Sequence, residues 1–274
     1  MSVPPLVVCA AAAALYALGG QGRAGSTSRG LRWREASFYA GLLALLVALE
    51  PPFDRLADES FAIHMAQHVV LLTIVPPLVV LGRPWPRMWM PFPTRIRRAA
   101  ARQLALGGWS APLRAAARVL TRPLVALAVL SASIGAWHVP ALYDAAVRSN
   151  TIHFAEHACY LVTALLFWAP LLEAPPVRAR IDHLRRAGLF AVAAVPGWIL
   201  ALVLTFANRP LYGAYAALQH RPGGISALAD QQLAAGVMLV PGSAAFFIAF
   251  FVSVYRWLEP GPVLETRPEE LSWT

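Results

Sequence analysis

The chain has 274 residues, of which 58% are hydrophobic and only 14% are charged, and its formal net charge is +9. Ordinary globular chains carry about 25% charged residues, so this composition excludes a conventional water-soluble domain and indicates a membrane protein. All 23 basic residues are arginine and lie in short blocks between apolar stretches. Such blocks act as orientation signals, so the charge indicates membrane topology and not a nucleic-acid partner.

Apolar stretches that approach the thickness of a bilayer recur along the chain. They lie near residues 4–20, 37–50, 61–81, 123–140, 152–172, 187–207 and 230–255. The sequence therefore predicts an all-α, polytopic membrane protein with about seven transmembrane helices, forming one domain over residues 1–274. The first stretch follows no positive residue and precedes no clear cleavage site, which favours a retained helix over a signal peptide.

The arginines predict the orientation of these helices. Nineteen of them lie in segments 21–36, 82–122 and 173–186 and in the tail from Arg256, whereas the N-terminus and the other connections hold four. Because cytoplasmic connections are enriched in arginine and lysine, this pattern predicts an outer N-terminus and a cytoplasmic C-terminus.

The longest connection, residues 83–122, contains nine arginines and no acidic residue. It is too polar to span a membrane, so we predict an Arg-rich cytoplasmic connecting segment. Within it, residues 95–120 mix alanines and leucines with arginines, which fits either an interfacial helix or a solvated basic loop.

Histidines are the main polar residues of the predicted spans. Ionisable residues inside a bilayer are costly and are therefore functional candidates by default. His64 and His68 are four residues apart, as are His153 and His157, so each pair lies on one helix face. Both pairs lie near the outer ends of their spans, and His138 lies at the outer end of the span between them. We therefore predict that the five imidazoles converge at one depth near the outer face.

This layer of imidazoles is a ligand set suited to copper, zinc, iron or haem. Glu156 adds a carboxylate near the same face, and the possible sulfur donors are Met65, Cys159 and Met238. Copper(I) also accepts sulfur ligands. Hydrogen bonding between helices and proton handling remain alternative roles for the histidines.

Two polar residues at the outer start of the last span form a second tier of candidates. Asp230 and Gln231 could orient imidazole nitrogens, although Asp230 fits better as an N-cap of its own helix. Pro76 and Pro77 are expected to break or kink the span that carries His64 and His68. The sequence contains no phosphate-binding glycine loop and no GxSxG motif, so ordinary nucleotide or acyl-transfer chemistry has no support.

Several short motifs follow one another along the chain. They are HMAQH at 64–68, PPL at 76–78, LGRP at 81–84, WHVPALY at 137–143, HFAEH at 153–157, and DQQ at 230–232 with Gly236 and Met238. In type and order they resemble the HMxxH, PPL, LGxP, WHxPxxY, HxxEH and DQQxxGxxM segments of the CtaG-type, multi-spanning cytochrome c oxidase assembly factors of bacterial caa-type oxidases. Leu239 stands where that pattern has tryptophan, which affects packing more than the proposed ligands.

The resemblance implies an assembly factor, and not an enzyme, for a haem-copper cytochrome c oxidase in the bacterial cytoplasmic (inner) membrane. Its expected partners are an oxidase subunit and membrane lipid, with no nucleic acid, and its expected cofactor is copper, handled on the outer side. The histidines would then bind copper transiently and present it to the oxidase. A haem-binding electron carrier, a membrane-bound histidine-ligated metallo-oxygenase and an ion or proton pathway remain alternatives.

Overall fold

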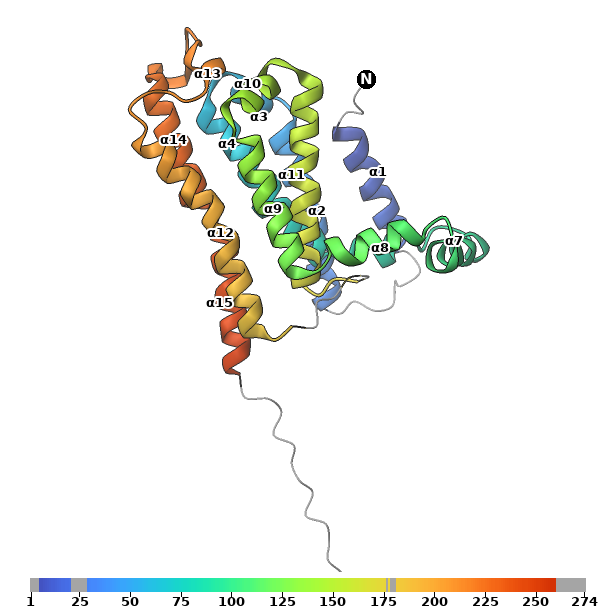
Figure 1. The fold of residues 1–274 in the computed structure, drawn as a ribbon. Helices are drawn as coiled ribbons and strands as arrows, with labels where there is room; N and C mark the ends of the chain where they lie inside the picture. Colours follow the sequence, from blue (N-terminus) through green and yellow to red (C-terminus); the bar gives the residue numbers. More distant parts are fainter. Residues whose placement is uncertain (1–4, 21–28, 176, 178–180, 260–274) are drawn as a thin grey trace, which may run out of the picture.

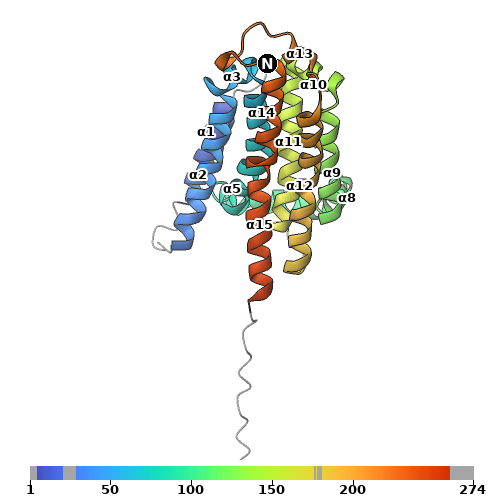
Figure 2. The ribbon, with the colours of Figure 1, turned by 90° about the vertical axis from the view of Figure 1, so that its left-hand side faces the viewer.

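The computed structural model describes residues 5–20, 29–175, 177 and 181–259. All regular secondary structure in these residues is helical, which confirms the predicted all-α class. The longer helices run side by side between the two ends of an elongated bundle (Figure 1), and Figure 2 shows the same bundle from its side.

The described residues form helices of very different lengths. The first part comprises α1 (Pro5–Leu18), α2 (Arg29–Leu49), α3 (Phe53–Glu59), α4 (Phe61–Val69), the π-helical turn η2 (Val70–Ile74), α5 (Val75–Leu81), α6 (Pro84–Met88), α7 (Thr94–Leu106) and α8 (Ala111–Leu120). The second part comprises α9 (Pro123–Trp137), α10 (Pro140–Arg148), α11 (Asn150–Leu171), α12 (His183–Phe206), α13 (Gly213–Ala216), the 3-10 turn η3 (Pro222–Gly224), α14 (Ala227–Leu239) and α15 (Pro241–Leu258).

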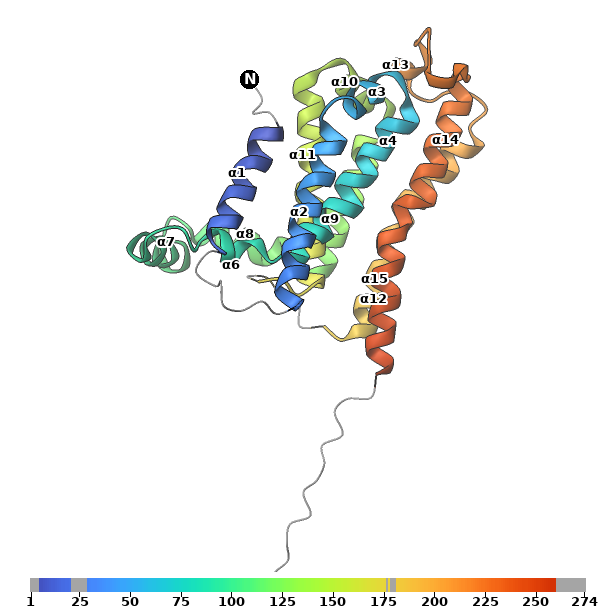
Figure 3. The same cartoon turned by 180° about the vertical axis from the view of Figure 1, so that it is seen from behind.

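The two ends of the bundle carry different elements. Figure 1 shows α3, α10 and α13 at one end and the last turns of α15 at the other, and Figures 1 and 3 show α7 and α8 projecting sideways from the bundle. The Arg-rich segment therefore contains three helices, α6, α7 and α8, and is not a loop without regular structure. The orientation of the two ends relative to the cytoplasm stays a prediction from the arginine distribution.

Four helical stretches are long and apolar enough to cross a membrane, namely Phe61–Leu81, Asn150–Leu171, His183–Phe206 and Ala227–Leu258. They coincide with four of the predicted spans. Two further candidates are bent pairs, α2 with α3 at 43° and α8 with α9 at 81°. The apolar helix α1 is shorter. Length and composition thus support four to six spans in the described residues, and the predicted count of seven is not confirmed.

The backbone hydrogen bonding of the helical stretch formed by α4, η2 and α5 changes next to two prolines. Pro76 and Pro77 have no backbone N–H, so the carbonyl of Leu72 loses its usual helical partner four residues later. The indole of Trp168 on α11 donates to that carbonyl at 3.0 Å. A local π-helical turn is one way in which a helix accommodates backbone groups that proline leaves without a partner, and the Trp168 contact attaches α11 to this turn.

Two clusters of buried apolar residues hold the helices together. The larger one includes Trp168 and Phe246, whose rings stack with centroids 5.3 Å apart, and joins α9, α11, α12 and α15. The smaller one includes Phe61, Tyr143 and Tyr212 and joins α4, α10 and the α12–α14 connection. The aromatic cluster lies against the segment of α4 that carries the paired histidines, and therefore shields them from water.

Candidate metal centre

The N-terminus of α4 is held by a carboxylate from a distant part of the chain. Asp230 on α14 accepts hydrogen bonds from the backbone N–H of Phe61 at 2.8 Å and of Ala62 at 3.0 Å, and from the Ser60 hydroxyl at 2.8 Å. The first N–H groups of a helix have no intrahelical partner, and a negative charge there is favourable. Asp230 thereby fixes the start of α4, and with it the position of His64 one turn later.

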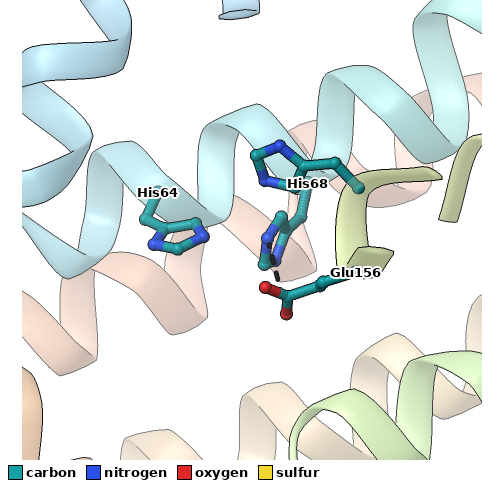
Figure 4. Close-up of side chains that lie close together, drawn as sticks. His64, His68 and Glu156 are labelled. Atoms are coloured by element: carbon teal, nitrogen blue, oxygen red, sulfur yellow. Dashed lines mark ion pairs between the residues drawn. The ribbon is translucent and has the colours of Figure 1, made fainter. Parts of the chain in front are cut away.

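Two neighbouring helices bring four potential metal ligands together. His64 and His68 come from α4, Glu156 and His157 come from α11, and one ligand atom from each lies within 4.8 Å of all the others. All four side chains are buried. Figure 4 shows the two histidines on successive turns of one helix with Glu156 facing His68, and the His68 Nε2 to Glu156 Oε1 distance is 3.7 Å. We call these four residues the imidazole–carboxylate cluster.

The remaining two predicted histidines flank this cluster. The ring of His153 has its centroid 4.1 Å from that of His157 and 5.0 Å from that of His64. The ring of His138, at the C-terminal end of α9, lies 6.0 Å from that of His68. The geometry therefore agrees with the expected convergence of all five imidazoles, while their role as ligands stays a prediction.

Many polar atoms of these residues are buried without a hydrogen-bond partner in the described parts of the chain. They are His64 Nε2, His68 Nδ1 and Nε2, His153 Nε2, His157 Nε2, and Glu156 Oε1 and Oε2. Buried polar atoms are normally paired, and an unpaired buried carboxylate is strongly destabilising. One cation would satisfy imidazole lone pairs and a carboxylate together, so the donor set fits a bound metal ion.

Tyr215 determines which nitrogen of His64 faces this centre. The Tyr215 hydroxyl donates to the Ala57 carbonyl at 2.7 Å and lies 2.5 Å from His64 Nδ1. Because a carbonyl carries no hydrogen, the single hydroxyl proton is used there, and Nδ1 of His64 must be the protonated nitrogen that donates to Tyr215. Burial raises the pKa of Tyr215, which keeps its hydroxyl protonated. A neutral His64 therefore presents the lone pair of Nε2 toward the cluster.

The structure also places the other candidates. Cys159 Sγ lies 3.3 Å from the Ser133 hydroxyl, outside the four-residue cluster. Gln231 accepts a hydrogen bond from Leu211 N–H at 2.7 Å and donates to the Leu204 carbonyl at 3.1 Å, so it anchors the α12–α13 connection.

The expectation that Asp230 caps its own helix is wrong. Ser226 is the N-cap of α14, and its hydroxyl accepts from Ala229 N–H at 3.1 Å. Asp230 is too far into α14 for that position and caps α4 instead, because tertiary packing brings the first turn of α4 beside it.

Sequence reasoning missed two tyrosines of the site. Tyr160 follows His157 by three residues, and its hydroxyl lies 3.1 Å from His138 Nδ1. Helical spacing alone could have indicated this residue. Tyr215 had no such signal, because it comes from a short connecting helix and meets Ala57 across 158 residues of chain.

Comparison with known proteins gives one match to a family. The family model of the cytochrome c oxidase caa3 assembly factors, Caa3_CtaG, matches residues 13–259. Uncharacterized proteins of Mycobacterium bovis and Mycobacterium tuberculosis are each 26% identical to the chain over 234 residues. These alignments cover 83% of this chain and 35% of each relative, so the chain spans about a third of their length. No solved structure matches the chain significantly.

Proposed function

The chain belongs to the Caa3_CtaG family of cytochrome c oxidase caa3 assembly factors, and from this premise we propose that it binds copper and delivers it to a subunit of the oxidase. The ion would be held by the imidazole–carboxylate cluster, with His153 and His138 beside it as exchange ligands. The protein would work as a non-enzymatic factor in the bacterial cytoplasmic membrane, with the cluster toward the outer face.

The observation that supports metal binding most directly is the environment of Glu156. Its side chain is fully buried, and within the described residues neither carboxylate oxygen has a hydrogen-bond partner. The His68 ring nitrogen at 3.7 Å is beyond hydrogen-bond distance. A fully buried carboxylate without a partner is costly, whereas a cation shared with three imidazoles would stabilise it.

The donor chemistry supports an ion that is exchanged and not locked in place. Imidazole is a good ligand for copper, zinc and iron, so the cluster is compatible with copper, although its donors do not select one metal by themselves. The imidazoles of His153 and His138 offer replacement ligands, because their ring centroids lie 4.1 Å from that of His157 and 6.0 Å from that of His68, respectively. A surplus of equivalent ligands permits stepwise transfer, which a delivery protein requires.

Metal content of the purified protein tests the binding step. The full chain would be purified in detergent, loaded with copper under reducing conditions and analysed for bound copper, next to Glu156→Gln and His157→Asn. His220→Ala is the matched control, since His220 is an exposed histidine outside the cluster. We expect bound copper in the parent and control proteins and clearly less of it in both cluster variants. Equal copper in all four proteins would contradict binding at the cluster, and a haem spectrum would favour the electron-carrier alternative.

Oxidase maturation tests the delivery step. Deletion of the gene should reduce the activity and copper content of the caa-type oxidase, and the parent gene and His220→Ala should restore both. Glu156→Gln should be produced at normal level in the membrane and fail to restore them. Full restoration by Glu156→Gln would overturn the role of this cluster in copper delivery and leave assembly independent of it.

A further inference from the structure

A cavity lies beside the imidazole–carboxylate cluster and contains two methionines. It is lined mainly by apolar residues of α9, η2, α12 and α15, and its polar or polarisable lining includes His68, His138, Met65 and Met238. His68 also belongs to the cluster, so the cavity and the cluster share one side chain. A soft cation leaving the cluster would therefore find both imidazole nitrogen and thioether sulfur among the donors of this cavity.

The tautomer of His138 follows from its backbone contact. His138 Nδ1 lies 2.7 Å from the carbonyl oxygen of Ile134. The carbonyl can only accept, so Nδ1 carries the hydrogen and Nε2 of the neutral ring carries a lone pair. The Tyr160 hydroxyl, 3.1 Å from the same Nδ1, and the Tyr212 hydroxyl, which donates to the His138 carbonyl at 3.1 Å, further fix this residue.

The unprotonated Nε2 of His138 faces the thioether sulfur of Met65, which also carries no hydrogen. His138 Nε2 and Met65 Sδ are 3.5 Å apart, and Met65 is fully buried. Two acceptors that face each other in a buried site gain nothing from their contact, whereas a cation between them would bind both. Metal–nitrogen and metal–sulfur bonds of about 2.0 Å and about 2.3 Å at a tetrahedral angle separate the two ligand atoms by about 3.5 Å. The observed distance therefore matches two ligands of one ion.

We propose that His138 and Met65 form a second metal site, selective for copper(I), with Met238 of the same cavity as an additional thioether ligand. Imidazole with thioether is a soft donor set that favours copper(I) over zinc(II). This inference deepens the proposed function and depends on it for the supply of the ion, which passes from the cluster through the shared residue His68. Copper stays in the +1 state throughout, so the transfer exchanges ligands and requires no electron.

The test uses the full chain in detergent, loaded without oxygen with copper(I) or, separately, with zinc(II). Met65→Leu and Met238→Leu remove sulfur at nearly constant volume, a change that cores tolerate best. Met88→Leu is the control, because Met88 lies on α6, away from the cavity lining. Copper X-ray absorption reports sulfur in the coordination shell, and competition with a chromophoric copper(I) chelator reports affinity.

We expect sulfur scattering in the parent protein and in Met88→Leu. Met65→Leu should lose that scattering and bind copper(I) about ten-fold more weakly or worse, with zinc(II) binding at the cluster unchanged. The unchanged zinc(II) binding also shows that this variant is folded. Copper(I) bound only by nitrogen and oxygen in the parent protein would overturn the second site.

The two proposals fail in different ways. If zinc(II) and copper(I) bind in the parent protein and Met65→Leu has no effect on either, the second site is refuted and the cluster stands. If Glu156→Gln retains all metal while Met65→Leu loses copper(I), the second site stands and the cluster proposal is refuted.

Discussion

Replacing Tyr215 by phenylalanine tests whether a connecting helix influences metal binding at the proposed imidazole–carboxylate centre. The hydroxyl receives a hydrogen bond from His64 Nδ1 at 2.5 Å and donates one to the Ala57 carbonyl at 2.7 Å. Phenylalanine removes only the hydroxyl and keeps the aromatic ring, whose centroid lies 5.3 Å from that of the Phe61 ring. The His64 ring then loses the partner that keeps the hydrogen on Nδ1 and the lone pair on Nε2.

The magnitude follows from the contacts that are lost. Removing a hydrogen-bond partner of a metal-binding histidine typically lowers metal affinity about 10- to 100-fold, or about 1.4–2.7 kcal/mol. The change also leaves the buried His64 N–H and Ala57 carbonyl unpaired, at about 1–3 kcal/mol each in stability. We therefore expect weaker metal binding and a lower unfolding temperature together.

Tyr212→Phe is the matched control because it separates the two effects. Tyr212 belongs to the same connection and is also buried, but its hydroxyl donates to the backbone carbonyl of His138 and, within the described residues, makes no hydrogen bond to a ring nitrogen. Its loss should lower stability by about 1 kcal/mol and leave zinc(II) affinity unchanged. Both variants would be titrated with zinc(II) by calorimetry after their thermal unfolding has been recorded.

One outcome would refute the reasoning outright. If Tyr215→Phe unfolds at a lower temperature but binds zinc(II) as tightly as the parent protein, the hydroxyl stabilises the fold and does not select the His64 tautomer. Equal losses of affinity in Tyr215→Phe and Tyr212→Phe would likewise contradict a specific effect on the His64 ring.

Three further changes test other parts of the structure. Asp230→Asn removes the charge that caps α4, and should cost about 1–3 kcal/mol in unfolding free energy; unchanged thermal unfolding would show that the cap is dispensable. Trp168→Phe leaves the Leu72 carbonyl beside the prolines unpaired and should cost about 1–3 kcal/mol, measured in the same way. Anionic lipid should raise the unfolding free energy of the parent protein, and replacing exposed Arg98 and Arg102 of α7 by glutamine should reduce this gain by about 1 kcal/mol per arginine. If neutral lipid stabilises the parent protein as much as anionic lipid does, electrostatic contact of α7 with lipid is contradicted.

Helical spacing made much of the candidate site accessible from sequence. The four-residue separation of His64 from His68, and of His153 from His157, places each pair on one face because the α-helix repeats every 3.6 residues. The structure keeps both pairs on continuous helices and packs the helices side by side. The family resemblance drawn from these motifs is confirmed by the family model.

The function of Asp230 shows where local reasoning fails. From sequence, an acidic residue near a helix start predicts a cap of that helix, since the rule considers only neighbours along the chain. In the structure the first turn of α4 lies within 3.0 Å of its carboxylate although about 170 residues separate them. The packing of α14 against α4 creates this contact, and no periodicity encodes it.

The sequence alone determined properties that depend on composition and on local repeats: the helical membrane class, the family, and the residues able to bind metal. Only the tertiary structure decided how those residues are presented, because hydrogen-bond partners are chosen by distance in space. Ala57 and Tyr215 fix one imidazole, Ile134 fixes another, and the sulfur of Met65 meets His138 across 73 residues. The tautomer of a histidine depends on such contacts. Because they join residues that are far apart in the sequence, the sequence pattern alone does not predict them.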